Sequence, residues 1–199
     1  MLFIGGQTDS MSFIAALVPI TEEAHGVRLQ LAYATNDNFT GKPVYRNALC
    51  YLHPDAEKAL AHAARAARQA GYVLKVFDAY RPGEAQQILF DIAQDPTFVA
   101  DPKRGSNHTR GCAVDVTLTD EAGNDLDMGT GFDAMQIESY HFTDGLSVQV
   151  QKNRLALLGI MLSAGFEHIP HEWWHWQLAG AKQYPLIEDG VGGVPKVMA

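Results

Sequence analysis

The sequence SNHTRGCAVD at residues 106–115 places two metal-binding residue types seven positions apart, and EWWH at residues 172–175 adds a glutamate and a second histidine. If the two stretches meet in space, they offer two imidazoles, one carboxylate ligand and a spare carboxylate. This is the inventory of a catalytic zinc site, with three protein ligands, a fourth position for water and a base beside it. The spacing differs from the helical H-E-x-x-H motif. We predict one Zn²⁺ per chain, bound by His108, Asp115 and His175.

Asp115 lies in a run that alternates as a strand does, with apolar residues at 114, 116 and 118. The alternation predicts that Asp115 and Thr117 face away from Val114 and Val116. A carboxylate in such a run is costly to bury without a partner, so either a metal ion or a salt bridge must neutralise it.

The second stretch poses a geometric difficulty. Glu172 and His175 would point to opposite sides of a regular strand, because their separation is odd. Both can approach one metal ion only if Glu172 lies at an irregular start of the strand. Pro170, two positions earlier, favours such an irregularity.

The pattern of the remaining chain predicts an α+β fold. Helices are expected at residues 54–70, 82–94 and 147–164, and strands at 72–79, 113–118, 166–169 and 173–178. Helices and strands do not alternate strictly, which favours a central, mostly antiparallel sheet flanked by helices. The length suits a single domain over residues 1–199, in which about the first 20 residues would form an N-terminal extension.

The composition is that of an ordinary globular protein, with 47% hydrophobic residues, 19% charged residues and a net charge of −8. An acidic chain lacks the basic face that nucleic acid requires, and no apolar run approaches about 18 residues. We therefore predict no nucleic-acid partner and no membrane span. Because the start of the chain lacks a basic, apolar leader, we expect the protein in the cytoplasm, with the periplasm as the alternative.

The chain has two cysteines, Cys50 and Cys112, which are too few for a disulfide framework. Cys112 lies between two proposed ligands, so a fourth metal ligand and a small buried side chain are both open interpretations. The second is favoured, because thiols are commonly buried as hydrophobic groups.

Several separated blocks, in a fixed order, carry a family resemblance. They are HGVR at 25–28, YATNDNFTGKPV at 33–44, DAYRP at 78–82, MGTGFD at 128–133 and EWWH at 172–175. Together with His-x6-Asp they resemble the peptidoglycan-directed zinc peptidases that share a fold with Hedgehog signalling domains. The resemblance is greatest to the D-alanyl-D-alanine dipeptidases associated with vancomycin resistance. It covers roughly residues 25–178 and implies a Hedgehog/D,D-peptidase-like fold.

The resemblance also implies a reaction and further site residues. The reaction is zinc-dependent hydrolysis of the small molecule D-Ala-D-Ala to two D-alanines. Glu172 would act as general base and then general acid, and Arg81 would stabilise the oxyanion. Four residues match positions of the substrate pocket, although structural roles suit them nearly as well: Ser106, Asp133, Tyr33 and Tyr45. Of these, Asp133 would bind the amino end of the dipeptide.

Two other functions remain open. A D,D-carboxypeptidase or L,D-endopeptidase would use the same metal blocks on peptidoglycan itself, but such an enzyme is usually exported. A non-catalytic zinc-binding module would need neither Glu172 nor Arg81. The sequence does not distinguish antibiotic resistance from dipeptide recycling, and it leaves open whether the chain forms a homo-oligomer.

Overall fold

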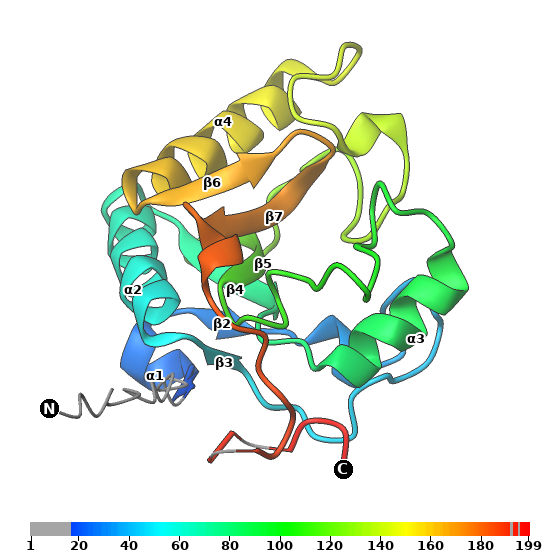
Figure 1. Ribbon diagram of the computed structural model, residues 1–199. Coiled ribbons are helices and arrows are strands. Elements are labelled where there is room, and N and C mark those ends of the chain that lie inside the picture. The colour runs from blue at the N-terminus through cyan, green and yellow to red at the C-terminus, as the bar shows by residue number, and fades with distance from the viewer. Residues whose placement is uncertain (1–16, 192, 195) are drawn as a thin grey trace, which may run out of the picture.

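The computed structural model describes residues 17–191, 193–194 and 196–199, and its centre is a five-stranded sheet (Figure 1). The strand order is β2-β4-β5-β7-β6, in which β2 and β4 are parallel and the other three pairs are antiparallel. The strands of this sheet are β2 Arg28–Leu29, β4 Val73–Asp78, β5 Ala113–Thr119, β6 Phe166–Ile169 and β7 Glu172–Leu178. The predicted α+β class with a mostly antiparallel sheet is confirmed.

The remaining elements flank this sheet. A second, two-stranded sheet pairs β1 with β3. The elements outside the large sheet are β1 Val18–Pro19, α1 Glu22–His25, β3 Tyr51–Leu52, α2 Pro54–Gln69, α3 Gly83–Ala93, α4 Val148–Ser163 and 3₁₀ turns at Ala32–Ala34, Ile137–Ser139 and Ala181–Gln183. The expected three long helices and four long strands all appear, and no end is shifted by more than one residue.

Local sequence explains where the long helices begin. Pro54 occupies the first turn of α2, and the side chain of His53 accepts a hydrogen bond from the backbone N–H of Asp55. The hydroxyl of Ser147 accepts a hydrogen bond from the backbone N–H of Val150 at the start of α4. These contacts satisfy N–H groups that have no partner within their helix.

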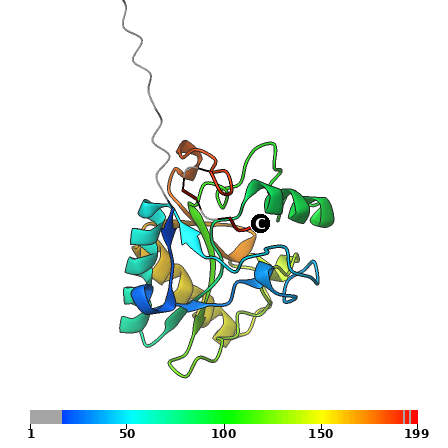
Figure 2. The same ribbon diagram turned by 90° about the horizontal axis from the view of Figure 1, so that it is seen from below.

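The two faces of the sheet are covered by different elements. Helices α2 and α4 pack on one face, which contains the main hydrophobic core (Figure 1). Val114, Val116 and Leu118 of the central strand β5 belong to that core, so Asp115 and Thr117 face the other way, as the alternation predicts. All of β5 is buried, because loops and α3 lie over its second face (Figures 1 and 2). The candidate site lies on this second face.

Short elements were not predicted, because a two-residue strand has no periodic pattern. β1 and β3 are of this kind, and they pair antiparallel to each other. Residues 1–16 of the expected N-terminal extension lie outside the described residues. Leu17 and Ile20, at its end, are buried.

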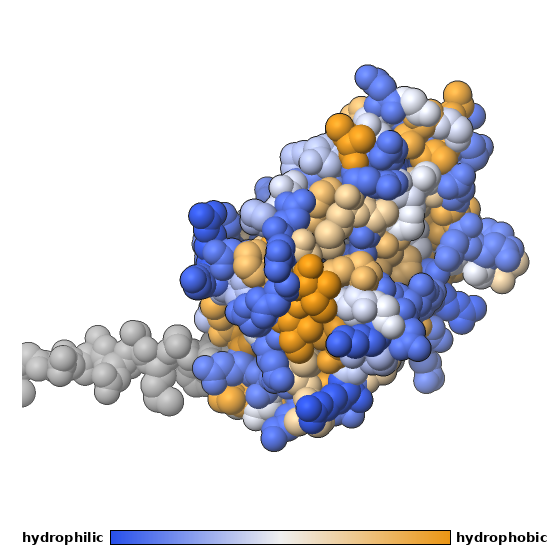
Figure 3. Space-filling model, turned by 90° about the vertical axis from the view of Figure 1, so that its right-hand side faces the viewer, coloured by the Kyte–Doolittle hydropathy of each residue, from blue (hydrophilic) through white to orange (hydrophobic). Residues whose placement is uncertain are grey.

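The surface mixes residue types. Figure 3 shows hydrophobic side chains in separate patches between hydrophilic ones on one face of the molecule. Within the described part of the chain, no helix is long and apolar enough to cross a membrane. The location in the cytoplasm or periplasm stays a prediction.

Candidate active site

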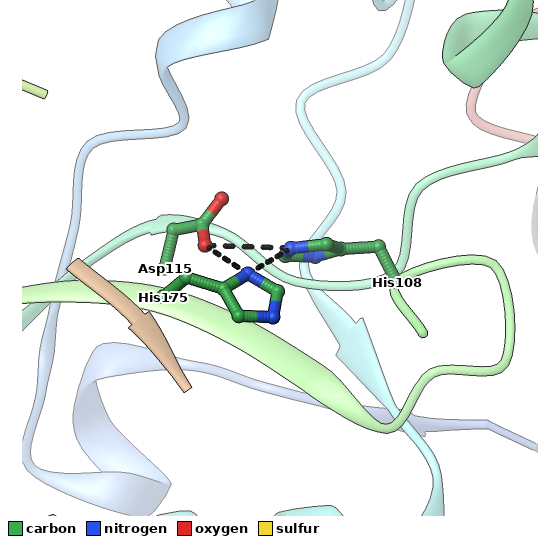
Figure 4. A group of neighbouring side chains, drawn as sticks. All are labelled: His108, Asp115 and His175. Carbon is green, nitrogen blue, oxygen red and sulfur yellow. Dashed lines mark hydrogen bonds and ion pairs between the residues drawn. The ribbon is translucent and has the colours of Figure 1, made fainter. Parts of the chain in front are cut away.

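Three buried side chains meet at the second face of the sheet: His108, Asp115 and His175 (Figure 4). Nε2 of His108 lies 3.1 Å from Nδ1 of His175 and 3.3 Å from Oδ1 of Asp115. Nδ1 of His175 lies 3.1 Å from Oδ1 of Asp115, so the three atoms form a triangle, which we call the triangle below. Zinc bonds of about 2.0–2.1 Å at tetrahedral angles separate neighbouring ligand atoms by about 3.3–3.4 Å. The triangle therefore fits three ligands of one tetrahedral zinc ion.

Strand pairing and one loop bring these residues together. Asp115 on β5 is the direct antiparallel partner of His175 on β7. His108 comes from the loop that precedes β5, and Gly111 allows this loop to turn with a φ of +66°. A Cβ at position 111 would come within 2.9 Å of the backbone nitrogen of His53, so this close approach also requires glycine.

The backbone fixes which nitrogen of His108 faces the site. Its Nδ1 lies 2.7 Å from the carbonyl oxygen of Ala79. A carbonyl only accepts, so Nδ1 carries the hydrogen and Nε2 keeps its lone pair for a metal. His175 presents the other nitrogen, Nδ1, to the same point.

The electrostatics favour the metal-binding forms of Asp115 and His175. Burial alone would raise the pKa of Asp115. The contacts with His108 and His175 lower this pKa by more than burial raises it, so the net shift is downward. Burial lowers the pKa of His175. An ionised carboxylate and neutral imidazoles are the forms that bind a cation.

Glu172, at the start of β7, is buried beside this triangle without being part of it. Its Oε2 lies 3.9 Å from Nδ1 of His175. Burial, followed by the negative charges of Asp115 and Asp133, raises the pKa of Glu172 well above its usual value. A carboxyl of this kind can hold a proton near neutral pH and release it again.

Arg81 lies beside Asp115 and is held by several partners. Its Nε donates to Oδ2 of Asp78 at 2.8 Å, and its Nη1 donates to Oε1 of Gln86 at 3.1 Å. Nη2 lies 3.4 Å from Oδ2 of Asp115, and the guanidinium carbon lies 5.0 Å from the ring centre of Tyr33. The cation is thus fixed beside the carboxylate of Asp115.

Asp133 is a partly buried carboxylate in a strained loop. Its φ of +59° is in the left-handed region, which only short polar residues other than glycine tolerate well. Its Oδ2 accepts a hydrogen bond of 2.8 Å from the hydroxyl of Tyr33. Burial, and then the charge of Asp115, raises the pKa of Asp133 to about 8.

A cleft of about 630 Å³ joins these groups. Besides the triangle, its walls include Glu172, Arg81, Asp133, Tyr33 and Ser106. Ser106 is buried, and its hydroxyl accepts a hydrogen bond of 3.2 Å from the backbone N–H of His108.

Tyr45 occupies a different place from the other predicted pocket residues. It is not among the residues that line the cleft. Its hydroxyl instead donates a 2.7 Å hydrogen bond to Oδ1 of Asp78. The structure therefore gives Tyr45 a contact with the carboxylate that holds Arg81 rather than with the cleft.

Two other residues had competing interpretations. Among the described residues, Cys112 is not part of the group that could hold a metal ion; it is buried, and its thiol lies 3.3 Å from the carbonyl oxygen of Arg110. His171 lines the cleft, with Nε2 3.7 Å from Oε1 of Glu172. It is near Glu172, although it is outside the triangle of His108, Asp115 and His175.

Sequence reasoning missed the two residues that hold Arg81. Asp78 ends β4 and Gln86 lies in α3, and both are fully buried. Asp78 begins the DAYRP block, which by itself gave it no role, and the only sequence signal of Gln86 is an amide five positions after Arg81. Such signals are too common on surfaces to assign a role without the fold.

Comparison with known proteins gives a consistent result. The model of a peptidase family described as D-ala-D-ala dipeptidase matches residues 14–190. The chain is 45% identical to the D-alanyl-D-alanine dipeptidase of Escherichia coli (strain K12) over 90% of its own length and 93% of the relative. It is 36% identical to that of Enterococcus faecium and 34% to that of Enterococcus faecalis, each over 80% of this chain and 89% of the relative.

Proposed function

The chain belongs to the D-Ala-D-Ala dipeptidase family of peptidases, and we propose that it hydrolyses the free dipeptide D-Ala-D-Ala to two D-alanines with the help of zinc. The observation that carries this proposal is the triangle of donor atoms with the buried carboxylate of Glu172 beside it. A peptidase accounts for both Glu172 and Arg81, so the non-catalytic alternative is set aside.

The residues of the triangle fit zinc by their chemistry and spacing. His108, Asp115 and His175 would hold the ion, and one carboxylate with two neutral imidazoles would leave it a residual positive charge. When bound, zinc acts as a Lewis acid that acidifies water and polarises a carbonyl. Its charge would also offset the repulsion among the carboxylates of the cleft.

Glu172 and Arg81 would supply the remaining chemistry. Glu172 lies close enough to the triangle to take a proton from water there, and its raised pKa would let it hold that proton and deliver it to the departing amine. Arg81, held by Asp78 and Gln86, would face the oxygen that becomes negative. One such donor contributes about 3–4 kcal/mol to lowering a barrier.

The cleft offers a counter-group for the free amine of a dipeptide. Asp133 would pair with the substrate ammonium. The ammonium would then take the place of the proton that the carboxyl of Asp133 holds at neutral pH. The hydroxyl of Tyr33 holds the carboxylate from one side. Ser106, at the wall of the same cleft, would complete the pocket.

The decisive experiment measures hydrolysis by the purified protein. D-Ala-D-Ala, acetyl-D-Ala-D-Ala and a muropeptide are each incubated with it, before and after chelation, and after zinc is restored. We expect the free dipeptide to be cleaved far better than the other two, with activity lost on chelation and regained with zinc. Equal cleavage of the acetylated dipeptide would contradict the dipeptidase function.

One observation favours a second candidate, hydrolysis of longer peptidoglycan peptides. The cleft of about 630 Å³ is within the range of about 300–1,000 Å³ typical of drug-sized ligands, so a dipeptide would not fill it. The muropeptide arm of the same experiment tests this alternative directly.

A further inference from the structure

The second nitrogen of His175 faces a pair of amide side chains. Its Nε2 lies 3.3 Å from Oε1 of Gln177, and the same oxygen accepts a 2.8 Å hydrogen bond from Nδ2 of Asn107. Gln177 is two positions after His175 on β7 and so shares its face of the strand. Both amides are half-buried in the wall of the cleft.

We propose that Gln177, oriented by Asn107, is a positioning residue that fixes His175 in the tautomer whose Nδ1 is free for the metal. This inference rests on the zinc site proposed above. Its physical basis is that a neutral imidazole carries one hydrogen. If Nε2–H donates to Oε1 of Gln177, the lone pair is left on Nδ1, the atom that faces His108 and Asp115.

Asn107 decides which end of the Gln177 amide faces the imidazole. Because Nδ2 of Asn107 donates, Gln177 must present its oxygen rather than its NH₂ group. A reversed pair of amides would present N–H groups to Nε2 of His175. The imidazole hydrogen would then move to Nδ1, where it would block the metal.

The same contact joins the two segments that carry ligands. Asn107 directly precedes His108 in the loop before β5, whereas Gln177 follows His175 on β7. The backbone oxygen of Asn107 also accepts a hydrogen bond of 3.0 Å from the N–H of Cys112. The amide pair therefore holds the loop that carries His108 against the strand that carries His175.

Two substitutions that each add one negative charge separate this role from simple electrostatics. In Gln177→Glu the carboxylate still accepts from both Nε2–H of His175 and Nδ2 of Asn107. In Asn107→Asp the new carboxylate accepts from the NH₂ group of Gln177 and so favours the reversed amide. Charge alone would strengthen zinc binding in both variants.

The test is zinc affinity, measured by competition with a chelator on the full chain. We expect Gln177→Leu to weaken zinc binding by about 10- to 100-fold, the usual cost of losing the partner of a ligand histidine. Gln177→Glu should bind at least as tightly as the wild type, and Asn107→Asp should bind more weakly. Gln87→Leu, which removes an exposed amide of α3, is the matched control and should change nothing.

A second measurement does not depend on metal. Nitrogen NMR of the zinc-free wild type should show the hydrogen of His175 on Nε2, and Gln177→Leu should show a mixture of tautomers. Unchanged zinc affinity in Gln177→Leu, or tighter binding in Asn107→Asp, would overturn the inference alone. A wild-type chain that binds no zinc would overturn the proposed metal site and this inference with it.

Discussion

Glu172 and His175 lie three positions apart on β7, yet Oε2 of Glu172 is 3.9 Å from Nδ1 of His175. The cause is a shift in register between β6 and β7. Ile169 pairs with Glu172, whereas the preceding residue of β6, His168, pairs with Trp176. The extra residues of β7 bend the strand, so that both side chains reach one cleft. The predicted irregular start of this strand is confirmed.

We expect the substitutions His108→Ala and His175→Ala to reduce bound zinc strongly, since each removes one of the three donor atoms of the triangle. Elemental analysis of the purified variants measures this directly. His62→Ala, which removes an exposed histidine of α2, should keep the zinc content of the wild type. Full occupancy in both ligand variants would contradict the assignment.

Glu172→Gln should keep the fold and the metal but lose about 10²- to 10⁴-fold in kcat, the usual contribution of general acid–base catalysis. The amide has the same size and cannot accept the proton. Zinc content, melting temperature and turnover of D-Ala-D-Ala are measured together, with Glu167→Gln on the exposed side of β6 as control. If the variant keeps substantial turnover, the nearby His171 becomes the better candidate for proton transfer.

Arg81→Lys should lower kcat by about 10²- to 10³-fold, as does removal of one oxyanion donor. A lysine cannot bond Asp78 and Gln86 at once while pointing at the substrate, because it lacks the planar fork of arginine. Kinetics on D-Ala-D-Ala test this, and the exposed Arg65 provides the control Arg65→Lys. A near wild-type kcat would show that a point charge suffices.

Asp133→Asn should raise KM for the free dipeptide much more than for acetyl-D-Ala-D-Ala, because only the free dipeptide has an ammonium to pair. The loss of binding free energy for the free dipeptide should be about 1–3 kcal/mol, the cost of leaving a buried polar group without its partner. KM and kcat are determined for both substrates. An equal change in KM for the two would argue that Asp133 does not contact the amine.

The ionisation of Asp133 should lower the stability of the zinc-free protein as the pH rises from about 4 to about 8. Across this range the folded state keeps the proton of Asp133, whose pKa is raised from an ordinary 3.8 to about 8, while the unfolded state has lost it. The free energy of unfolding then falls by at most about 1.4 kcal/mol per pH unit for this group. Glu172, whose pKa is raised as well, adds to the same slope.

Urea unfolding of chelator-treated protein at several pH values measures this slope. Asp133→Asn should remove the contribution of Asp133 to the slope, and Asp144→Asn, at an exposed carboxylate, should leave the slope as it is. Added zinc should reduce the loss at high pH, because a cation stabilises the ionised carboxylates around it. A slope that is unchanged in Asp133→Asn would contradict the burial argument.

The sequence alone determined the features that depend on local pattern. The local sequence pattern predicted α2 and α4 to within one residue at each end. The alternation along β5 correctly separated Asp115 from the core-facing Val114 and Val116. These predictions succeed because a side chain's direction on a helix or strand follows from its position in the repeat.

Tertiary structure alone decided how the site is assembled. The register shift that turns Glu172 toward His175 depends on how β6 pairs with β7. The contact between Asn107 and Gln177 joins residues 70 positions apart, and neither residue has a local signal for it. Hydrogen-bond partners of buried polar groups are chosen by which segments pack together, and no periodic pattern within one segment contains that information.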